Sequence, residues 1–258
     1  MAIKMGCCNA RPALPPDAPE EERTIAAKEA ELGYSKNPAP QVFTTIKKNS
    51  DAGKISPSKF NTIALELALN TTDYDSPDTP MCTFYTKLKE KGKYDLVKLG
   101  VLGVLLGRGA GKAALYFDCV AKEDGSPLES AEVRALFDAL FFVSAEALPV
   151  LVKVEDGETA TPGLSMVASK VTDYVNSLKA GKDNLAERYT NAVMKGRGKV
   201  TAQDFVAAFE GDENLSALTT PFGVRSALKK EAQASKPAGV PKGAIALLGK
   251  GLLGGLKK

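Results

Sequence analysis

Apolar residues recur at helical spacing in four segments of the chain, 56–67, 130–141, 164–178 and 201–209. The first two place apolar side chains at i, i+3, i+4 and i+7, which is the pattern of a helix with one buried face. The apolar members are Phe60, Ile63, Ala64 and Leu67; Val133, Leu136, Phe137, Leu140 and Phe141; Leu164, Val167, Val171, Val175 and Leu178; and Phe205 and Phe209. Alternating strand patterns of any length are lacking. The sequence therefore predicts an all-α fold with short loops.

Breaks in this pattern divide the chain into five parts. The second part should contain a helix that begins with Asp17 as its N-cap, carries Pro19 and an acidic first turn, and ends near Gly33. A lobe boundary is expected at 150–161, where a turn is flanked by few helix formers. The parts are an irregular terminus (1–16), an N-terminal helix with its linker (17–40), helices with three glycine-centred turns (41–149), a helical lobe with a fourth turn (150–228) and a basic tail rich in glycine and leucine (229–258).

The four glycine-centred turns share one arrangement, in which a helix leads into a polar loop, an apolar residue follows the glycine, and a second helix begins. The turns are Ser50–Ile55, Lys89–Tyr94, Glu123–Leu128 and Lys195–Val200. This arrangement resembles the EF-hand family, to which calmodulin belongs. The resemblance implies two lobes of paired degenerate EF-hands, short loop-loop strand contacts between the apolar residues, an extra N-terminal helix and flexible tails. The alternative is four ordinary helix-turn-helix connections.

The resemblance also assigns ligand positions in four twelve-residue loops, numbered here loop 1 (48–59), loop 2 (87–98), loop 3 (121–132) and loop 4 (193–204). Calcium requires about six to eight oxygen ligands, several of them charged. Lysine or arginine occupies many of these positions in loops 1, 2 and 4, so these loops should repel calcium. We expect these cations to act as built-in counter-ions that hold the loops in one conformation.

Loop 3 fits the EF-hand pattern best, because Glu132 holds its last position and apolar residues flank it on both sides. The resemblance makes Glu123, Glu129 and Glu132 a candidate calcium site. Ala121 and Gly125 supply no side-chain oxygen at two other ligand positions, and Gly125 stands one place early. Weakly bound calcium, or no cofactor at all, is therefore expected.

Composition argues against catalysis. The chain of 258 residues contains no histidine, which removes the commonest general base and the imidazole metal ligand. The segment 107–113 looks like a phosphate-binding loop, but Leu106 and Ala113 stand where that motif needs glycine and serine or threonine. The net charge of +3 does not by itself imply nucleic-acid binding. We expect neither enzymatic activity nor binding of nucleotide or nucleic acid.

Cysteine usage and hydropathy predict a cytoplasmic protein. Cys82 and Cys119 lie in helix-like apolar patterns, where a buried reduced thiol is expected, and no disulfide framework is visible. No signal peptide is recognisable. The most apolar stretch, Leu96–Tyr116, is interrupted by charged residues and glycines, so no transmembrane helix is predicted.

The N-terminal segment resembles the lipidated start of membrane-attached EF-hand sensors. Gly6 would accept a myristoyl chain if translation began at Met5, and Cys7 and Cys8 would accept palmitoyl chains. Ala10 departs from the favoured serine or threonine. The alternative is a disordered terminus with two incidental thiols.

The C-terminal tail combines lysines with apolar residues at helical spacing. Such a segment can order on a lipid surface or in a protein groove, or remain a loose tail. The residues concerned are Lys242, Ile245, Leu248, Lys250, Leu252, Leu256, Lys257 and Lys258. Together the two ends form a candidate two-signal anchor for an anionic membrane.

The sequence as a whole predicts a non-enzymatic EF-hand-like adaptor or scaffold that is largely calcium-independent. Its expected partner is a protein that contributes a helical segment, and an anionic membrane surface is a second candidate. The phenylalanines at 137, 141, 205 and 209 are candidates for the partner groove, with simple core as the alternative. Two other functions remain open: a calcium sensor that uses loop 3, and a structural subunit of a large cytosolic or cytoskeletal assembly.

Overall fold

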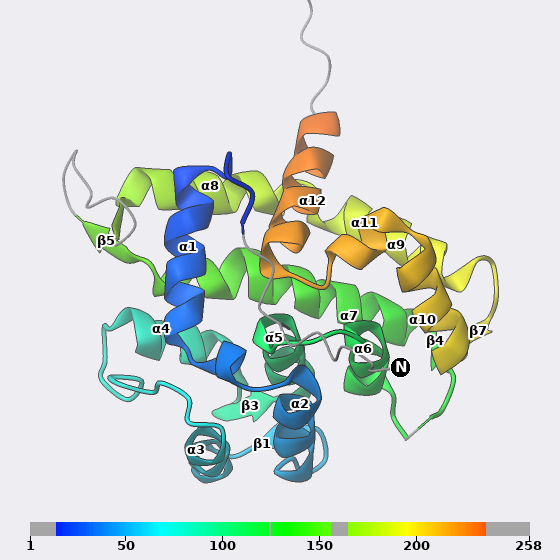
Figure 1. Cartoon of the computed structure of the whole chain (residues 1–258), viewed down its shortest axis with the longest axis horizontal. Coiled ribbons are helices and arrows are strands. Elements are labelled where there is room, and N and C mark those ends of the chain that lie inside the picture. Colours follow the sequence, from blue (N-terminus) through cyan, green and yellow to red (C-terminus); the bar gives the residue numbers. More distant parts are fainter. Residues whose placement is uncertain (1–13, 124, 156–164, 236–258) are drawn as a thin grey trace, which may run out of the picture.

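Helices make up most of the molecule (Figure 1). The computed structural model describes residues 14–123, 125–155 and 165–235. The α-helices are α1 (Glu20–Glu31), α2 (Ala39–Lys48), α3 (Pro57–Glu66), α4 (Pro80–Lys87), α5 (Leu96–Leu106), α6 (Lys112–Val120), α7 (Ser130–Phe142), α8 (Ala168–Lys179), α9 (Lys182–Met194), α10 (Ala202–Gly211), α11 (Glu213–Ala217) and α12 (Pro221–Ala234). Short turns η1 (Tyr34–Lys36), η2 (Val143–Ala147) and η3 (Leu148–Leu151) complete the helical structure. The predicted mainly helical fold is confirmed.

Within the described ranges, the strands are two or three residues long and form three small sheets. They are β1 (Lys54–Ile55), β2 (Lys89–Glu90), β3 (Lys93–Asp95), β4 (Leu128–Glu129), β5 (Lys153–Glu155), β6 (Ser165–Val167) and β7 (Lys199–Val200). Antiparallel pairing joins β1 to β3, β2 to β3, and β4 to β7. The β1–β3 pair and the β4–β7 pair each link two glycine-centred turns that are distant in sequence.

Apolar residues face each other in these two linking pairs. Ile55 lies opposite Tyr94, and Leu128 lies opposite Val200. All four side chains are fully buried. The β1–β3–β2 sheet lies at the lower edge of the molecule in Figure 1, and the β4–β7 pair lies at the right edge. The molecule therefore has two separate sites where glycine-centred turns meet.

Left-handed backbone conformations produce the sharp bends in these turns. Gly53 and Gly92 have φ angles of 76° and 78°, and each follows a residue that is also left-handed. In the first turn Asp51 and Lys54 exchange two backbone hydrogen bonds of 2.8 and 3.0 Å, which closes a tight hairpin. Strands β2 and β3 close the second turn in the same manner, with Glu90 opposite Lys93. Glycine suits these positions because it has no Cβ to clash.

The core is centred on α5, which is buried around almost its whole circumference. It packs against α2, α6 and α7. Gly103 allows close approach to α2, because a Cβ there would lie 2.7 Å from Val42. Within the described residues, no helix is both long and apolar enough to span a bilayer. Buried residues on both sides of the predicted boundary at 150–161 belong to one continuous core.

Two predicted helix starts are corrected by the structure. Helix α1 begins at Glu20 after Pro19, and Asp17 does not cap it. Helix α8 begins at Ala168, because Val167 belongs to β6, which pairs in parallel with β5. Leu164, assigned to the same stripe, lies outside the described residues. The starts of α3 and α10 agree with the sequence, since Ser56 and Thr201 cap them.

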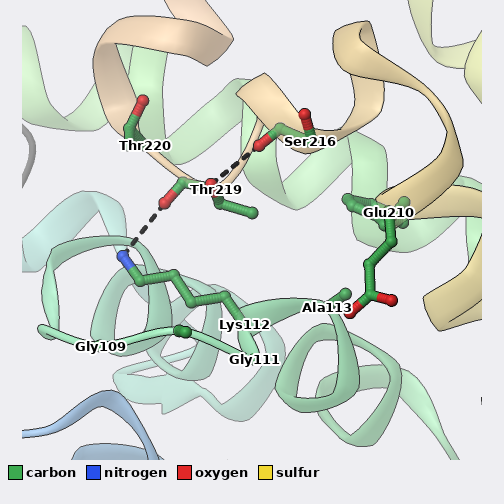
Figure 2. A pocket seen from close by; sticks show the side chains of 10 residues that line it. Gly109, Gly111, Lys112, Ala113, Glu210, Ser216, Thr219 and Thr220 are labelled. Atoms are coloured by element: carbon green, nitrogen blue, oxygen red, sulfur yellow. Dashed lines mark hydrogen bonds between the residues drawn. The ribbon is translucent and has the colours of Figure 1, made fainter. Parts of the chain in front are cut away.

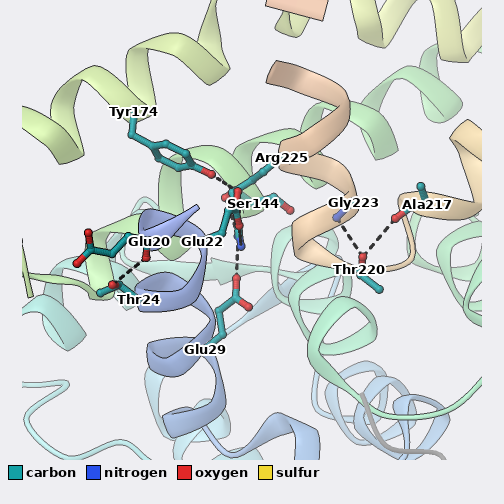
Figure 3. A network of polar contacts seen from close by, with 10 residues as sticks. All are labelled: Glu20, Glu22, Thr24, Glu29, Ser144, Tyr174, Ala217, Thr220, Gly223 and Arg225. Atoms are coloured by element: carbon teal, nitrogen blue, oxygen red, sulfur yellow. Dashed lines mark hydrogen bonds and ion pairs between the residues drawn. The ribbon is translucent and has the colours of Figure 1, made fainter. Parts of the chain in front are cut away.

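A buried ionic cluster fastens α1 to the opposite end of the chain (Figure 3). Arg225 on α12 is fully buried and donates to Glu22 at 2.7 Å and to Glu29 at 2.7 Å. The Tyr174 hydroxyl on α8 also donates to Glu22. Burial opposes the charge on Arg225, but Glu29 and Glu22 outweigh it and raise its pKa. These contacts join three helices, α1, α8 and α12.

Candidate functional site: ion-paired loops

The loops that the sequence singled out are closed by ion pairs within the protein. In loop 2, Glu90 accepts from Lys54 of loop 1 at 2.7 Å and from Lys98 at 2.8 Å. Lys98 occupies the twelfth loop position, where an EF-hand places its bidentate calcium ligand. An ammonium group and its carboxylate partner thus meet across loop 2.

The ion pairs between loops 1 and 2 shift the pKa values of the groups that form them. Hydrogen bonds from Lys54 and Lys98 lower the pKa of Glu90 to about 2. Hydrogen bonds to Asp95 and Glu90 raise the pKa of Lys54. Asp95 lies 2.7 Å from Lys54 and also caps α5 by accepting from the backbone N–H of Lys98. Both carboxylates of loop 2 are therefore already engaged by protein groups.

Loop 3 contains the residues predicted to form a calcium site. Glu132 pairs with Lys122 at 2.9 Å and accepts from the backbone N–H of Glu129 at 2.8 Å, which forms a capping box at the start of α7. These contacts, the backbone one foremost, lower the pKa of Glu132. Glu129 pairs with Lys199 of loop 4 at 3.1 Å. Two of the three predicted ligands thus contact lysines.

The third predicted ligand, Glu123, contacts Ser126 through its backbone. Its backbone carbonyl accepts from the Ser126 hydroxyl at 2.9 Å. Among the described residues, which exclude Asp124, no three side chains of the metal-binding types gather closely enough to hold an ion. The proposed set of Glu123, Glu129 and Glu132 remains a prediction.

Loop 4 also contains an ion pair that involves its twelfth position. Arg197 at position five lies 2.7 Å from Asp204 at position twelve. Asp204 also contacts the hydroxyl of Thr201, and Arg197 leads the groups that lower its pKa. The left-handed glycine of this loop is Gly196, with φ of 73°, two places ahead of the expected position. Val200 nevertheless lies opposite Leu128 in the strand pair, as expected for the apolar residues of two paired loops.

The four phenylalanines considered for a partner groove belong to the core. Phe137, Phe141, Phe205 and Phe209 are 0 to 1% exposed. Phe205 and Phe209 stack with ring centroids 4.8 Å apart, and Phe137 stacks on Phe209 at 6.2 Å. They pack against one another in the core, which is the alternative stated from the sequence.

Residues 109–113 of the glycine-rich segment line a pocket of about 260 Å³ (Figure 2). Lys112 is buried, and its ammonium group donates to the carbonyl oxygens of Leu105 at 2.8 Å and Thr219 at 3.1 Å. Glu210 lies on the opposite side of the pocket from Lys112. The lysine thus ties the start of α6 to the segment before α12.

Predicted residues at the two ends of the chain lie outside the described residues. These are Gly6, Cys7 and Cys8, and the tail residues from Lys242 to Lys258. Cys82 is half-buried and Cys119 is buried, and both are free thiols. Burial raises the pKa of Cys119 well above its usual range, which disfavours the reactive thiolate.

Sequence reasoning missed two groups of residues that the structure brings together. Glu90 was not recognised as the bridge between Lys54 and Lys98, although it is the one acidic residue within Lys89–Tyr94. Arg225 was missed because its partners, Glu22 and Glu29, lie about two hundred positions away. An arginine within the apolar face of α12 was the available signal.

No family model, curated protein or solved structure matches this chain in comparisons with known proteins.

Proposed function

We propose that this chain is a degenerate EF-hand protein that works as a non-enzymatic, calcium-independent adaptor or scaffold for a partner protein. One observation carries the proposal: in loops 2, 3 and 4 the residue at the twelfth position is engaged in an ion pair with another side chain of the same loop. A calcium ion would have to displace these cations and leave them unpaired. The loops therefore need no metal to keep their shape.

The pairing of the loops supports the family assignment. Loop 1 contacts loop 2 and loop 3 contacts loop 4, in each case through an apolar residue that follows the turn. Helices α2 and α3 flank loop 1, α4 and α5 flank loop 2, α6 and α7 flank loop 3, and α9 and α10 flank loop 4. Paired helix-loop-helix units of this kind are the building block of EF-hand proteins.

The hairpins in loops 1 and 2 support calcium independence. Their backbone groups bond across a tight turn, as the two hydrogen bonds between Asp51 and Lys54 illustrate. These bonds hold each turn closed without a metal ion. The proposed protein would stay in one conformation, and its partner would dock on a surface that calcium does not alter.

Titration calorimetry with calcium tests this proposal, and a converted variant calibrates it. The substitutions K87D, K89D, K91D and K98E would give loop 2 carboxylates at positions one, three, five and twelve, with Asp95 already at nine. We expect no binding by the natural chain and binding with a Kd of about 0.1 mM or tighter by the converted chain. Four exposed lysines outside the ligand positions, changed to aspartate, provide the matched control: Lys36, Lys153, Lys170 and Lys229.

The outcomes separate the alternatives. Tight binding of calcium at more than one site of the natural chain would favour the calcium sensor and overturn the proposal. Failure of the converted chain to bind would show that the loops do not follow the EF-hand ligand order. Affinity recovery with calcium and with chelator should yield the same partner proteins, while permanent residence in a large particle on gel filtration would favour a structural subunit.

A further inference from the structure

The two pairs of loops differ sharply in charge. Loops 1 and 2 contain eight lysines and three acidic residues, a net charge of +5, whereas loops 3 and 4 contain four basic and five acidic residues. The whole chain carries only +3. Loops 1 and 2 are therefore the more positive of the two loop pairs, and they lie at the end of the molecule that holds the β1–β3–β2 sheet (Figure 1).

Three of the eight lysines in loops 1 and 2 form ion pairs: Lys54 with Glu90 and Asp95, Lys98 with Glu90, and Lys48 with Glu66. Of the other five, Lys89 is half-buried and lies over the Tyr94 ring. The last four are exposed and have no acidic partner among the described residues; they are Lys59, Lys87, Lys91 and Lys93, here named the lysine face. In loops 3 and 4 only Lys195 is comparable, because Lys122, Arg197 and Lys199 are paired.

The two hairpin turns beside the lysine face are exposed. Gly53 and Gly92 are both exposed, and a Cβ built on either would meet nothing within 4 Å. Exposed lysines of this kind can approach a broad charged surface. All cations of the lysine face are lysines, which act as point charges, whereas arginine is the residue that grips individual carboxylates or phosphates bidentately.

The geometry points to the lysine face as a docking surface for an anionic lipid membrane. Lysines near a negatively charged leaflet attract it without fixed stereochemistry, each contributing about a fivefold increase in partitioning. The attraction is screened within a Debye length, so the surface should bind at low salt and release at high salt. The inference is independent of calcium and of the EF-hand assignment, since it rests only on charge and exposure.

Vesicle sedimentation tests the inference with the full chain. The vesicles contain phosphatidylcholine with about 30 mol% phosphatidylserine, or phosphatidylcholine alone. The variant K59Q/K87Q/K91Q/K93Q removes the lysine face. The matched control K36Q/K153Q/K170Q/K195Q removes the same charge from exposed lysines elsewhere.

We expect the natural chain to sediment with anionic vesicles and not with neutral ones. The lysine-face variant should lose at least about tenfold in partitioning, and the control less than about threefold, with both folded by circular dichroism. Soluble phosphate and chloride at equal ionic strength should release the chain from the vesicles equally well. Stronger release by phosphate would indicate a specific phosphate-binding site instead of attraction to a lipid surface. Equal losses in the two variants, or binding only to an acidic protein, would overturn the inference.

Discussion

Glu90 illustrates how one side chain can serve two loops. It accepts from Lys54 of loop 1 and from Lys98 of its own loop, so it links the two loops next to their strand contact. Its side chain is 47% exposed, which means that water screens both contacts. Exposed ion pairs usually contribute less than about 1 kcal/mol each. The contribution of Glu90 to stability should therefore be modest but measurable through its pH dependence.

We predict that E90Q lowers the free energy of unfolding by about 0.5–1 kcal/mol at pH 7, and that this difference vanishes in acid. The folded pKa of about 2 lies below the usual value of 4.5. The stabilisation is therefore fully present above pH 4.5 and is lost as the pH falls toward 2. Urea unfolding at pH 7, 4 and 3 measures the convergence. E187Q, at an exposed position, is the control and should behave like the natural chain at each pH.

Residue identity predicted the helix caps better than the ion pairs. Ser56 and Thr201, the first residues of two segments predicted to be helical, cap α3 and α10, because a cap needs only a short side chain next to its own helix. The partners of Glu90 depend on long side chains from two loops, whose approach is set by the strand pairing. The sequence allowed the loop positions to be compared with those of an EF-hand, but it did not reveal the ion pairs that form there.

The strand pairs show how much structure a short element can carry. Each linking pair contains only two registered positions, yet it brings together helices from distant parts of the chain. The buried apolar residues make the pairs effective, because apolar burial rather than a few hydrogen bonds provides the stability. Leu128 and Val200 are both fully buried at their junction. The junctions should behave as coupled units.

We predict energetic coupling between Leu128 and Val200. L128A should cost about 2–4 kcal/mol and V200A somewhat less, and the double variant should deviate from additivity by at least about 0.5 kcal/mol. The pair I55A and V200A, from the two different junctions, is the control and should be additive within about 0.5 kcal/mol. Denaturant unfolding of all single and double variants supplies the data. Additivity of Leu128 with Val200 would contradict the role of the junction.

Element boundaries were predictable where local pattern decides them. The stripe assigned to 164–178 failed at its start, because pairing of β6 with β5 holds Val167 in an extended conformation. A three-residue parallel strand leaves no periodic signal. In loop 4 the sequence offers both Gly196 and Gly198 for the sharp turn, and only Gly196 is left-handed. Glycine permits either choice, so only the surrounding contacts select one.

The part of the chain that the structure describes is closed by a contact between its first and last helices, α1 and α12. The apolar face of α1 is small, with Ile25 as its main buried apolar residue, and its buried acidic residues face Arg225 instead. Two carboxylates and one guanidinium share an interior from which water is excluded. Such a cluster adds little net stability when complete, but it is costly to break because a charge is left buried without a partner. The cluster therefore makes the placement of α1 specific.

We predict that R225M destabilises the protein by about 3–5 kcal/mol, because Glu22 and Glu29 lose their counter-ion. The triple variant R225M/E22Q/E29M should recover most of the loss, since no buried charge remains and the side-chain amide introduced by E22Q can still accept from the Tyr174 hydroxyl. R188M, which breaks the pair between the exposed Arg188 and the mostly buried Glu231, is the control and should cost about 1 kcal/mol. Urea unfolding measures these changes, and hydrogen exchange should show α1 and α12 opening together in R225M. A cost near that of R188M, or faster exchange in α1 alone, would mean that the ionic cluster does not hold the ends of the chain together.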